Sequence, residues 1–461
     1  MDMQLRDIAA ATSGQLHGAD AASEMHVRAV NTDSRQPVPA SLFVALRGER
    51  FDAHEFAAGA IAGGAIALLV ERVLPLSVPQ IVVADTRRAL GDLARAWRRR
   101  CAATVVGLTG SAGKTTVKEM IASILRQDGE TLATQGNLNN DIGVPLTLFR
   151  LQPSHRYAVI EMGANHAGEI AYCAAIAEPS VAAITLIGAA HLEGFGSIEG
   201  VARAKSEIFA ALPTNGCAVL NQDALHQPIL RAAIGSRKTL GFGSTPAADI
   251  RAENIVLDSA ACARFTLVTP RGQVAVQLPV PGQHNVMNAL AAAGVGEALG
   301  LPLARIAKGL QETPVVGGRL VRKQTRSGAA LIDDTYNANL ESVKAAIDLL
   351  VSLPGQPVLV LGDMGELGAE AAAIHAEVGR YAREKRLAAL YSLGKLSAET
   401  SAAFGAGGQH FLELEPLLVA LQTALTATHV VLVKGSRSAR MERVVSALST
   451  PNNDKDHGEM H

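Results

Sequence analysis

The segment from Gly107 to Thr116 reads GLTGSAGKTT and carries the clearest chemical signal in the chain. An apolar run over 104–108 precedes it, and a helical pattern over 117–125 follows it. A strand, a glycine-rich turn, a Lys-Thr pair and a helix form a phosphate-binding loop, in which backbone N–H groups and the helix N-terminus face phosphate oxygens. Lys114 is expected to reach the β- and γ-phosphates, and Thr115 to hold Mg²⁺. The sequence therefore predicts a nucleoside triphosphate site.

The spacing of this loop is a variant of the general P-loop, because Leu108 stands where the general pattern has its first glycine. The alternative is an ordinary glycine-rich turn between a strand and a helix. The Gly-Lys-Thr-Thr run that opens the helix argues against that alternative. The residues expected to contact the nucleotide are Thr109, Gly110, Ser111, Ala112, Gly113, Lys114, Thr115 and Thr116.

Three further residues occupy positions that a nucleotide site could use. Glu161 ends an apolar strand pattern over 157–161, and a carboxylate at the carboxyl end of a parallel strand faces the ligand crevice, where it could hold Mg²⁺. His191 follows a second strand pattern over 181–187. A strand-end ion pair for Glu161 and a structural role for His191 stay open as alternatives. Lys205 lies in a helical segment, where the pattern alone predicts a surface lysine in an i,i+4 pair.

Polar clusters mark two candidate substrate contacts. Asn137, Asn139 and Asn140 lie in a loop before a helix, where amides could bind a polar substrate or could serve equally well in turns and helix caps. Asn288 lies near the start of another helix and could simply cap it.

An arginine and a second polar cluster lie at the expected junction with the last part of the chain. Arg319 follows two glycines, and the segment 333–339 reads DDTYNAN after a strand pattern. Such groups could close over phosphates. They could equally form structure between domains.

Composition excludes several classes of protein. The chain has 461 residues, of which 48% are hydrophobic, with 42 basic and 43 acidic side chains. The near balance of charge argues against a nucleic-acid binder, which needs a basic face. The four cysteines form no C-x-x-C pair, so neither a zinc site nor a dithiol is indicated. We expect an intracellular α/β enzyme of two to four domains.

The N-terminal residues show no charged-then-apolar pattern of a signal peptide, and no apolar run approaches the ~18 residues of a membrane span. These observations lead us to expect a cytoplasmic protein with no membrane span. The tail after Pro451 is polar, and we expect it to be frayed.

The elements that must position these residues fall into three expected domains. Residues 1–84 form a small N-terminal α/β domain, with strand patterns over 42–46, 66–70 and 81–83. Residues 85–313 form the central P-loop domain, whose alternating strands and helices predict a doubly wound, mostly parallel sheet. Near its end, 264–270 and 273–278 alternate like a β-hairpin, which we expect at an antiparallel edge of that sheet. Residues 314–461 form a C-terminal Rossmann-like α/β domain.

Together these segments resemble the Mur ligases, the ATP-dependent amide-bond ligases of cytoplasmic peptidoglycan synthesis. The loop over 109–116 has the Mur spacing rather than the general P-loop spacing. The match covers nearly the whole chain. It continues, in the family order, through Glu161, His191, Lys205, Asn288, Arg319 and Asp334.

Four segments resemble one branch of the family, which adds D-alanyl-D-alanine to UDP-N-acetylmuramoyl-tripeptide. They cover 136–145, 333–339, 361–368 and 433–438. The Asp-Asn-Pro-Arg motif of the branch that adds diaminopimelate is not in this sequence. One departure is Leu340, where the resembling branch often has proline after Asn-Ala-Asn, and we expect it to affect the turn more than the chemistry.

The resemblance implies catalytic roles for Lys114, His191, Lys205 and Arg319 and two Mg²⁺ ions. Thr115 and Glu161 would serve the first ion. Lys205 would be carbamylated, which converts an ammonium into a carboxylate, and would hold the second ion together with His191.

The resemblance also implies binding roles. Asn288 would approach the base of ATP. Arg319, Asp334, Tyr336 and Asn337 would reach ATP from the third domain as it closes. Ser34 and Arg35 would contact the uridine nucleotide, and the asparagines at 137, 139 and 140 would face substrate.

The implied reaction joins D-alanyl-D-alanine to the tripeptide through an acyl phosphate, giving UDP-MurNAc-pentapeptide, and the enzyme is expected to be a monomer. One alternative is another ligase of the same superfamily, such as a folylpolyglutamate synthetase or a sister Mur ligase. Others are a P-loop ATPase that drives a conformational change and a binding-only homologue. The full set of phosphate and metal groups argues against the last. The third residue of the tripeptide, diaminopimelate or lysine, is not fixed by the sequence.

Overall fold

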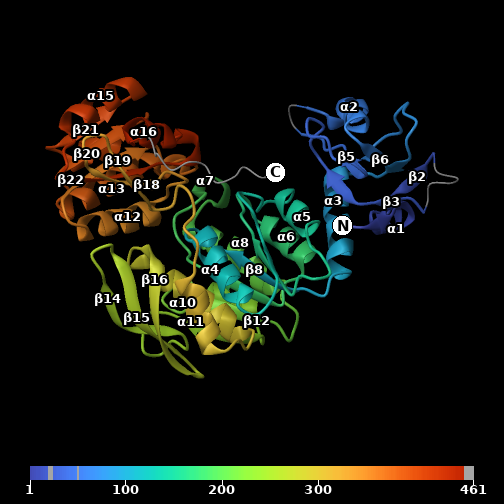
Figure 1. Ribbon diagram of the computed structural model, residues 1–461, viewed down its shortest axis with the longest axis horizontal. Coiled ribbons are helices and arrows are strands. Elements are labelled where there is room, and N and C mark those ends of the chain that lie inside the picture. The colour runs from blue at the N-terminus through green and yellow to red at the C-terminus, as the bar shows by residue number, and fades with distance from the viewer. Residues whose placement is uncertain (19–23, 49–50, 451–461) are drawn as a thin grey trace.

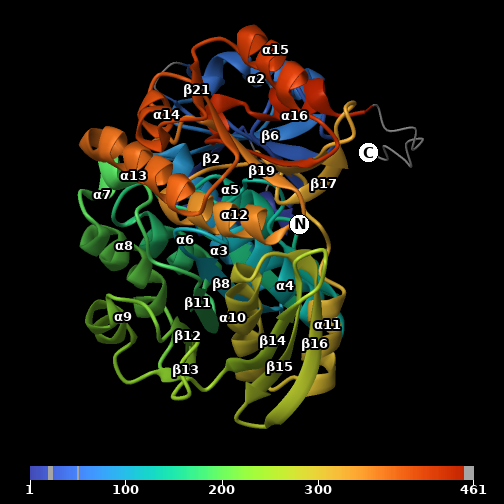
Figure 2. The same cartoon turned by 90° about the vertical axis from the view of Figure 1, so that its left-hand side faces the viewer.

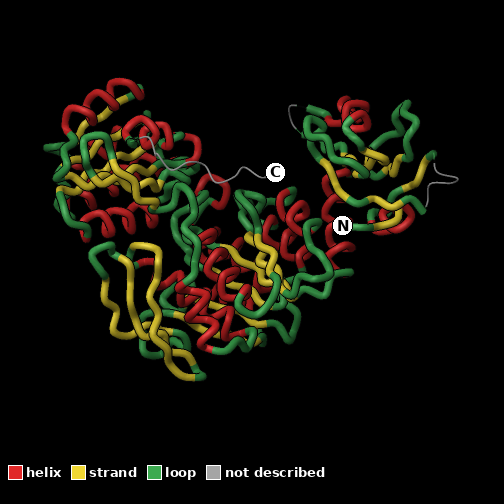
Figure 3. The backbone as a smooth tube through the Cα atoms, viewed as in Figure 1, coloured by secondary structure: helices red, strands yellow, loops and turns green. Residues whose placement is uncertain are grey.

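The computed structural model describes residues 1–18, 24–48 and 51–450, in which three α/β units follow one another along the chain. The N-terminal and C-terminal units, blue and orange-red in Figure 1, lie on either side of the central green and yellow unit. Strands in yellow and helices in red alternate in all three (Figure 3). The fold class expected from the sequence is thus confirmed. The polar tail after Pro451 lies outside the described residues.

The N-terminal unit is built on a five-stranded sheet of order β2-β7-β6-β5-β4, with β1 and β3 paired separately. Its central strands are buried because both faces are covered, by α2 on one side and by α1 and α3 on the other. Its elements are β1 Met3–Gln4, α1 Leu5–Ala11, β2 Gln15–His17, β3 His26–Val27, β4 Ala29–Asn31, β5 Ser41–Val44, the 3₁₀ turn η1 Ala53–Phe56, α2 Ala57–Ala62, β6 Ala65–Val70 and β7 Gln80–Val82.

The central unit contains a six-stranded, fully parallel sheet of order β13-β12-β11-β8-β10-β9. Helices alternate with these strands and cover both faces, as parallel sheets require. The elements are α3 Thr86–Arg99, β8 Thr104–Thr109, α4 Lys114–Arg126, β9 Thr131–Ala133, α5 Gly143–Leu148, β10 Tyr157–Glu161, α6 Glu169–Ala177, β11 Val181–Ile184, α7 Leu192–Phe195, α8 Ile198–Ala210, β12 Cys217–Asn221, α9 Gln227–Ile234 and β13 Lys238–Phe242.

Strand β8 shows why this sheet is rigid beneath the P-loop. Val105 packs with helices α3, α5, α6 and α8, whereas Val106 and Leu108 pack into a second core with α4, α10 and α11. Successive side chains of a strand point to opposite faces, so β8 is buried on both sides. The loop that follows β8 therefore starts from a fixed point.

The hairpin predicted near 264–278 exists, but its expected place in the main sheet was wrong. It belongs to a separate three-stranded antiparallel sheet of order β14-β15-β16, formed by β14 Arg251–Leu257, β15 Cys262–Thr269 and β16 Gly272–Pro281. A single bridge from Phe242 to Ile250 is the contact through which the chain leaves the main sheet. The outer strand β14 carries an irregularity between Glu253 and Val256. The unit ends with α10 His284–Ala298 and α11 Leu303–Gln311.

The C-terminal unit has a six-stranded sheet of order β17-β18-β22-β19-β20-β21, parallel except for β17. Separate cores fill its two faces. Its elements are β17 Val321–Gln324, β18 Ala330–Asp334, α12 Leu340–Ser352, β19 Gln356–Gly362, η2 Gly368–Glu370, α13 Ala371–Glu384, β20 Ala389–Leu393, α14 Ala398–Phe404, β21 Gly408–Phe411, α15 Leu414–Ala424, β22 His429–Lys434, η3 Arg437–Ala439 and α16 Glu442–Leu448.

Figure 2 shows α12 and α13 of this unit above the central sheet, with α7 beside α13. The C-terminal unit therefore faces the loops at the carboxyl ends of the central strands. Within the part of the chain that the structure describes, no helix has both the length and the apolar character needed to cross a membrane.

Candidate nucleotide-binding and ligase site

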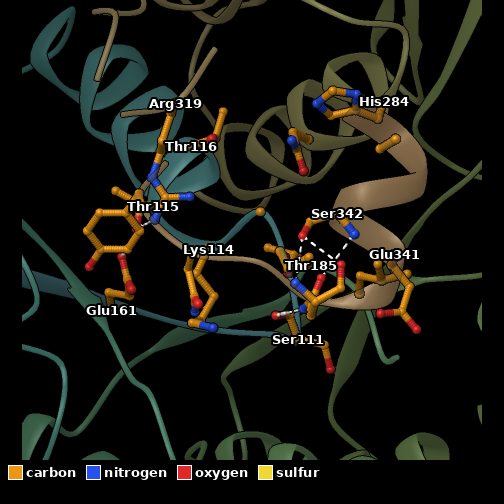
Figure 4. Close-up of a pocket in the computed structure, with 18 of the residues that line it drawn as sticks. Ser111, Lys114, Thr115, Thr116, Glu161, Thr185, His284, Arg319, Glu341 and Ser342 are labelled. Carbon is orange, nitrogen blue, oxygen red and sulfur yellow. Dashed lines mark hydrogen bonds between the residues drawn. The ribbon is translucent and has the colours of Figure 1, made fainter. Parts of the chain in front are cut away.

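A cavity of about 1160 Å³ lies where the central and C-terminal units meet. Its walls come from the P-loop, the ends of β10 and β11 and the start of α10 on one side, and from the segment 313–320 and the start of α12 on the other. Figure 4 shows Arg319, Thr115 and Glu161 grouped at one side of this pocket, and Ser111, Glu341 and Ser342 at the other. Ligands of open α/β sheets bind at this carboxyl edge of the strands.

The P-loop joins the end of β8 at Thr109 to the start of α4 at Lys114. Gly113 has a φ of +77°, and a Cβ placed on it would lie 2.6 Å from Oδ1 of Asn288. A side chain at 113 would therefore be strained and would collide with α10. Lys114 Nζ donates to the carbonyl of Gly110 at 2.8 Å, and burial lowers the pKa of its ammonium. This geometry is that of a phosphate cradle whose lysine already bends back over the loop.

The loop after β11 holds the P-loop from the other side. Ser111 N donates to the carbonyl of Leu186 at 2.8 Å, and Ser111 Oγ donates to the carbonyl of Gly188 at 3.0 Å. Thr185 Oγ1 donates to the carbonyl of Ala112 at 2.5 Å. These bonds fix the turn before any ligand arrives, which is the preorganisation that charge stabilisation requires.

The first predicted metal pair is assembled. Thr115 Oγ1 donates to Oε2 of Glu161 at 3.0 Å, and Glu161 is only 2% exposed. Asn139 Nδ2 donates to the other oxygen of Glu161 at 2.8 Å, and Arg319 Nη2 donates to Thr115 Oγ1 at 2.9 Å. Four of the predicted residues, from four separate segments of the chain, thus meet at one point.

These oxygen atoms fit Mg²⁺, which binds one or two protein oxygens and completes its shell with phosphate and water. Thr115 and Glu161 offer a hydroxyl and a carboxylate beside the phosphate cradle. Among the residues that the structure describes, no three His, Cys, Asp or Glu side chains cluster as a metal cage. The protein groups alone therefore fit an ion shared with a nucleotide better than a metal held by protein alone.

His191 begins α7 in a left-handed conformation, with φ +54°. Its Nδ1 lies 2.5 Å from Oε2 of Glu366 in the C-terminal unit, although the two groups are not aligned as a hydrogen bond. This contact holds the pKa of the Glu366 carboxyl below its usual range. The edge of the histidine ring meets Phe195, with ring centroids 6.4 Å apart.

Lys205 is fully buried, so the surface position that its local pattern predicts was wrong. It lies in α8, which packs against α6, α9, β8 and β11, and its Nζ has no hydrogen-bond partner. Burial, with a smaller effect of the Lys114 charge, lowers the pKa of Lys205 well below its usual value. Its Nζ lies 5.9 Å from the centre of the Phe195 ring, which His191 also meets. Lys205 is thus a buried amine without a hydrogen-bond partner, held close to the ring that His191 also meets.

The C-terminal unit contributes a connected group of side chains to the cavity. Lys434 Nζ donates to Oδ2 of Asp334 at 2.6 Å and to the carbonyl of Asn337 at 2.8 Å. Burial nevertheless raises the pKa of Asp334, against the opposing effect of Lys434. The guanidinium of Arg319 stacks over Tyr336, 4.3 Å from the ring centre, which orients it toward Thr115.

The start of α12 supplies contacts that the sequence reasoning did not single out. Asn339 caps the helix by accepting from Ser342 N, and its Nδ2 donates to the carbonyl of Ser111 at 3.0 Å. Glu341 Oε1 accepts from Ala189 N at 2.7 Å, where Gly188 leaves no room for a Cβ. The sequence marked 333–339 only as a polar cluster, and it is the tertiary fold that brings the cap residue Asn339 onto the P-loop.

The remaining predicted residues fall in two places. Asn288 lines the cavity and donates to Oδ1 of Asn285, and the three asparagines predicted to face substrate also line it. Ser34 and Arg35 lie in the loop after β4, outside the cavity lining, where Arg35 pairs with Asp33 at 2.8 Å. Lys205 is not among the residues that line the cavity. The sequence did not single out Lys434, which lines the cavity, or Glu366, which contacts His191.

Three family descriptions match the chain in order along its length. "Mur ligase family, catalytic domain" matches residues 26–98, "Mur ligase middle domain" matches 108–296, and "Mur ligase, glutamate ligase domain" matches 318–437. The last two meet at the cavity, since they contain the P-loop and Arg319 respectively.

Individual relatives agree with this assignment. The UDP-N-acetylmuramoyl-tripeptide–D-alanyl-D-alanine ligase of Escherichia coli is 50% identical over 96% of this chain and 97% of its own. A crystal structure of MurF from Acinetobacter baumannii superposes with a TM-score of 0.92 at 40% identity, covering 97% and 98% of the two chains. MurF of Thermotoga maritima, solved in complex with ADP, has a TM-score of 0.82 at 30% identity and covers 91% and 97%. This chain therefore belongs to the Mur ligase family.

Proposed function

We propose that this protein ligates D-alanyl-D-alanine to UDP-N-acetylmuramoyl-tripeptide, with ATP as the energy source, and forms UDP-MurNAc-pentapeptide. The observation that carries the proposal is the cavity in which Lys114, Thr115 and Glu161 of the central unit meet Arg319 of the C-terminal unit. Identity of 50% to the E. coli ligase, over nearly all of both chains, supports this substrate pair over other Mur ligase substrates.

In the first half-reaction, an oxygen of the tripeptide carboxylate attacks the γ-phosphorus of ATP. The bond from that phosphorus to the β–γ bridging oxygen breaks, which releases ADP and leaves an acyl phosphate. An anion attacking a polyanion needs its charge neutralised. Lys114 and Arg319 supply positive charge at that point.

In the second half-reaction, the free amine of D-alanyl-D-alanine attacks the acyl carbon. The tetrahedral intermediate expels phosphate and the nitrogen loses a proton, which leaves the new amide. Water would hydrolyse the acyl phosphate, so the site must exclude it. The contacts of Asn339 with Ser111 and of Glu341 with Ala189 support a C-terminal unit that covers the reacting groups.

Two Mg²⁺ ions would neutralise phosphate charge and polarise the reacting oxygens. Thr115 and Glu161 would hold the first. His191 and a carbamate on Lys205 would hold the second. Carbamate formation needs an uncharged amine, and the burial of Lys205 and its lowered pKa support that chemistry.

The other predicted residues would bind and orient the nucleotide and the substrates. Asn288, beside Gly113, would approach the nucleotide base, and Asp334, Tyr336 and Asn337 would contact ATP from the C-terminal unit. The asparagines at 137, 139 and 140 would face substrate. We also propose that Ser34 and Arg35 bind the uridine nucleotide, that the domain boundaries lie near 84 and 313, and that the protein acts as a monomer in the cytoplasm.

The direct test measures phosphate release from ATP and Mg²⁺ with UDP-MurNAc-tripeptide and D-alanyl-D-alanine each present or omitted. We expect release only when both are present, with a product heavier by the dipeptide in a mass spectrum. Tripeptides ending in diaminopimelate or lysine should be compared in parallel, because the sequence does not distinguish them.

The same assay separates the alternatives. Release that is indifferent to both substrates would identify an ATPase and overturn the ligase proposal. Release with a different amino acid in place of the dipeptide would identify a sister ligase of the superfamily.

A further inference from the structure

Glu366 crosses from the C-terminal unit to the loop that carries His191. It lies between β19 and η2, and its Oε2 is 2.5 Å from Nδ1 of His191. A second contact runs alongside, because Glu193 N faces the carbonyl of Glu366 at 3.4 Å. In Figure 2, α7 lies beside α13, which η2 precedes directly in the chain. The two units thus meet at the residue predicted to bind the second metal.

The segment that presents Glu366 is held firmly by its neighbours. Met364 and Leu367 on either side of it are buried, and Met364 N donates to Nε2 of His375 at 3.0 Å. Glu366 itself has φ +62°, a conformation that a residue with a side chain keeps only when its surroundings impose it. The carboxylate is therefore presented from a fixed base.

Stability does not explain the contact between Glu366 and His191. The Glu366 side chain is 57% exposed, and ion pairs this accessible contribute little to folding. A role in metal binding explains the contact, because a histidine that binds metal through one ring nitrogen commonly donates the N–H of the other to a carboxylate. Oε2 of Glu366 lies within reach of Nδ1, although the N–H is not aligned with it in this structure. With Glu366 at Nδ1 and Phe195 against the ring edge, Nε2 is left for a metal.

We propose that Glu366 is a positioning residue that orients His191 for the second Mg²⁺, and so couples binding of that ion to closure of the C-terminal unit. This inference rests on the proposed function, in which a second ion is held by His191 and carbamylated Lys205. Because Glu366 and His191 belong to different units, separating the units removes the carboxylate from the ring. The second ion site is then complete only when the cavity is covered, which delays phosphoryl transfer until water is excluded.

The test replaces Mg²⁺ with Mn²⁺ and counts bound ions by electron paramagnetic resonance in the presence of the imido analogue of ATP. The variants are Glu366→Ala and Glu366→Gln, with Glu370→Ala as a control on an exposed carboxylate of the same segment. The wild type should bind two ions. Loss of an outer-shell partner typically weakens a metal about 10- to 100-fold, so Glu366→Ala should weaken the second ion by about that factor and leave the first unchanged.

The glutamine variant separates orientation from charge. Its amide oxygen would accept from Nδ1–H once the ring aligns on metal binding, so Glu366→Gln should retain much of the affinity that Glu366→Ala loses. A glutamine variant as weak as the alanine variant would show that negative charge is needed, and would overturn the orienting role. Circular dichroism and melting temperature should match the wild type for all three variants.

Two outcomes distinguish this inference from the proposed function. Two ions bound equally well in Glu366→Ala and in the wild type would overturn the role of Glu366 and leave the ligase proposal intact. A single ion in the wild type would overturn the two-ion site together with this inference, while phosphate release with both substrates still decides whether the protein is the ligase.

Discussion

The two candidate metal positions of this site are built in different ways. Thr115 and Glu161 are already joined by a hydrogen bond inside the central unit, and Asn139 holds the second carboxylate oxygen. His191 and Lys205 have no such bond, since Lys205 Nζ has no partner and the nearest carboxylate to His191 comes from Glu366 in another unit. The side chains of the first position are joined within the central unit, whereas in the proposed mechanism the second depends on carbamylation of Lys205 and on a second unit.

This difference implies an order for nucleotide binding, metal binding and closure of the C-terminal unit. In the proposed mechanism, a nucleotide and its first ion would bind the central unit alone, because Ser111 and Thr185 hold the P-loop there. The second position adds a requirement for closure. Each prediction below tests one side of the comparison, from the largest effect to the smallest.

The largest loss of activity is expected from a change in the P-loop, on the side of the site formed within the central unit. Lys114→Ala should lower kcat by about 10⁴-fold, because phosphoryl transfer depends on positive charge at the transferred group. Circular dichroism and the melting temperature should stay close to those of the wild type, since Lys114 Nζ bonds only to the loop itself. The control is Lys308→Ala, which removes an exposed lysine and should leave kcat unchanged. Lys118 is less suitable as a control position because its side chain is buried. Turnover by Lys114→Ala at the wild-type rate would remove the ATP assignment.

At the other side, Lys205→Ala should lower kcat by about 1000-fold, because it removes a group that stabilises developing charge. A small carboxylate such as formate should restore part of the activity by occupying the vacated space, whereas Lys205→Arg, which keeps a charge, should not respond. Rates with increasing formate give the measurement. Unchanged activity without added carboxylate would mean that Lys205 is only a packing residue.

A stability measurement tests how closely the units approach each other. Burial, reinforced by Lys434 of the C-terminal unit, lowers the pKa of His284 to about 4. The unfolded chain takes up a proton near pH 6.5 and the folded chain does not, so stability falls as the pH drops through 6.5, with a full loss of about 3 kcal/mol below pH 4. His284→Gln should lack this loss in urea titrations between pH 7 and 5, and the exposed His166→Gln should retain it. Equal pH dependence of wild type and His284→Gln would contradict the lowered pKa of His284.

The smallest effect is expected at the contact of α12 with the P-loop. Asn339→Ser keeps a residue that can cap α12 but loses the donor to the Ser111 carbonyl. One lost hydrogen bond is worth about 1 kcal/mol, so KM for ATP should rise about 5-fold with little change in melting temperature. Ser342→Ala weakens the same cap without touching Ser111 and serves as the control. A larger effect from the control would assign the loss to the helix rather than to closure.

The side formed within the central unit was predictable from the sequence because its members follow local rules. A P-loop helix and a carboxylate ending a parallel strand meet at one edge of a sheet, so Thr115 and Glu161 could be placed together before the fold was known. Lys205 could not be placed by such a rule. Its neighbours in α8 suggested a surface pair, and only the packing of α8 against the sheet and two other helices buries it.

Long-range contacts limited the prediction elsewhere. Nothing in the sequence near Glu366 or Asn339 shows that these residues face His191 and Ser111 across a domain boundary. The alternation over 264–278 correctly predicted a hairpin, but periodicity does not say which sheet a hairpin joins. In the structure the hairpin pairs with β14 in a sheet of its own, beyond the isolated bridge between Phe242 and Ile250.

The irregularity in β14 has a consequence for how the protein behaves among its own copies. An outer strand that exposes Ile255 and Val256 offers the kind of edge on which another chain could add a strand. The register shift between Glu253 and Val256, with Asn254 at φ +54°, interrupts the even row of N–H and C=O groups that such an addition would need. The free edge of this small sheet is thus a poor template for strand addition by another copy of the chain.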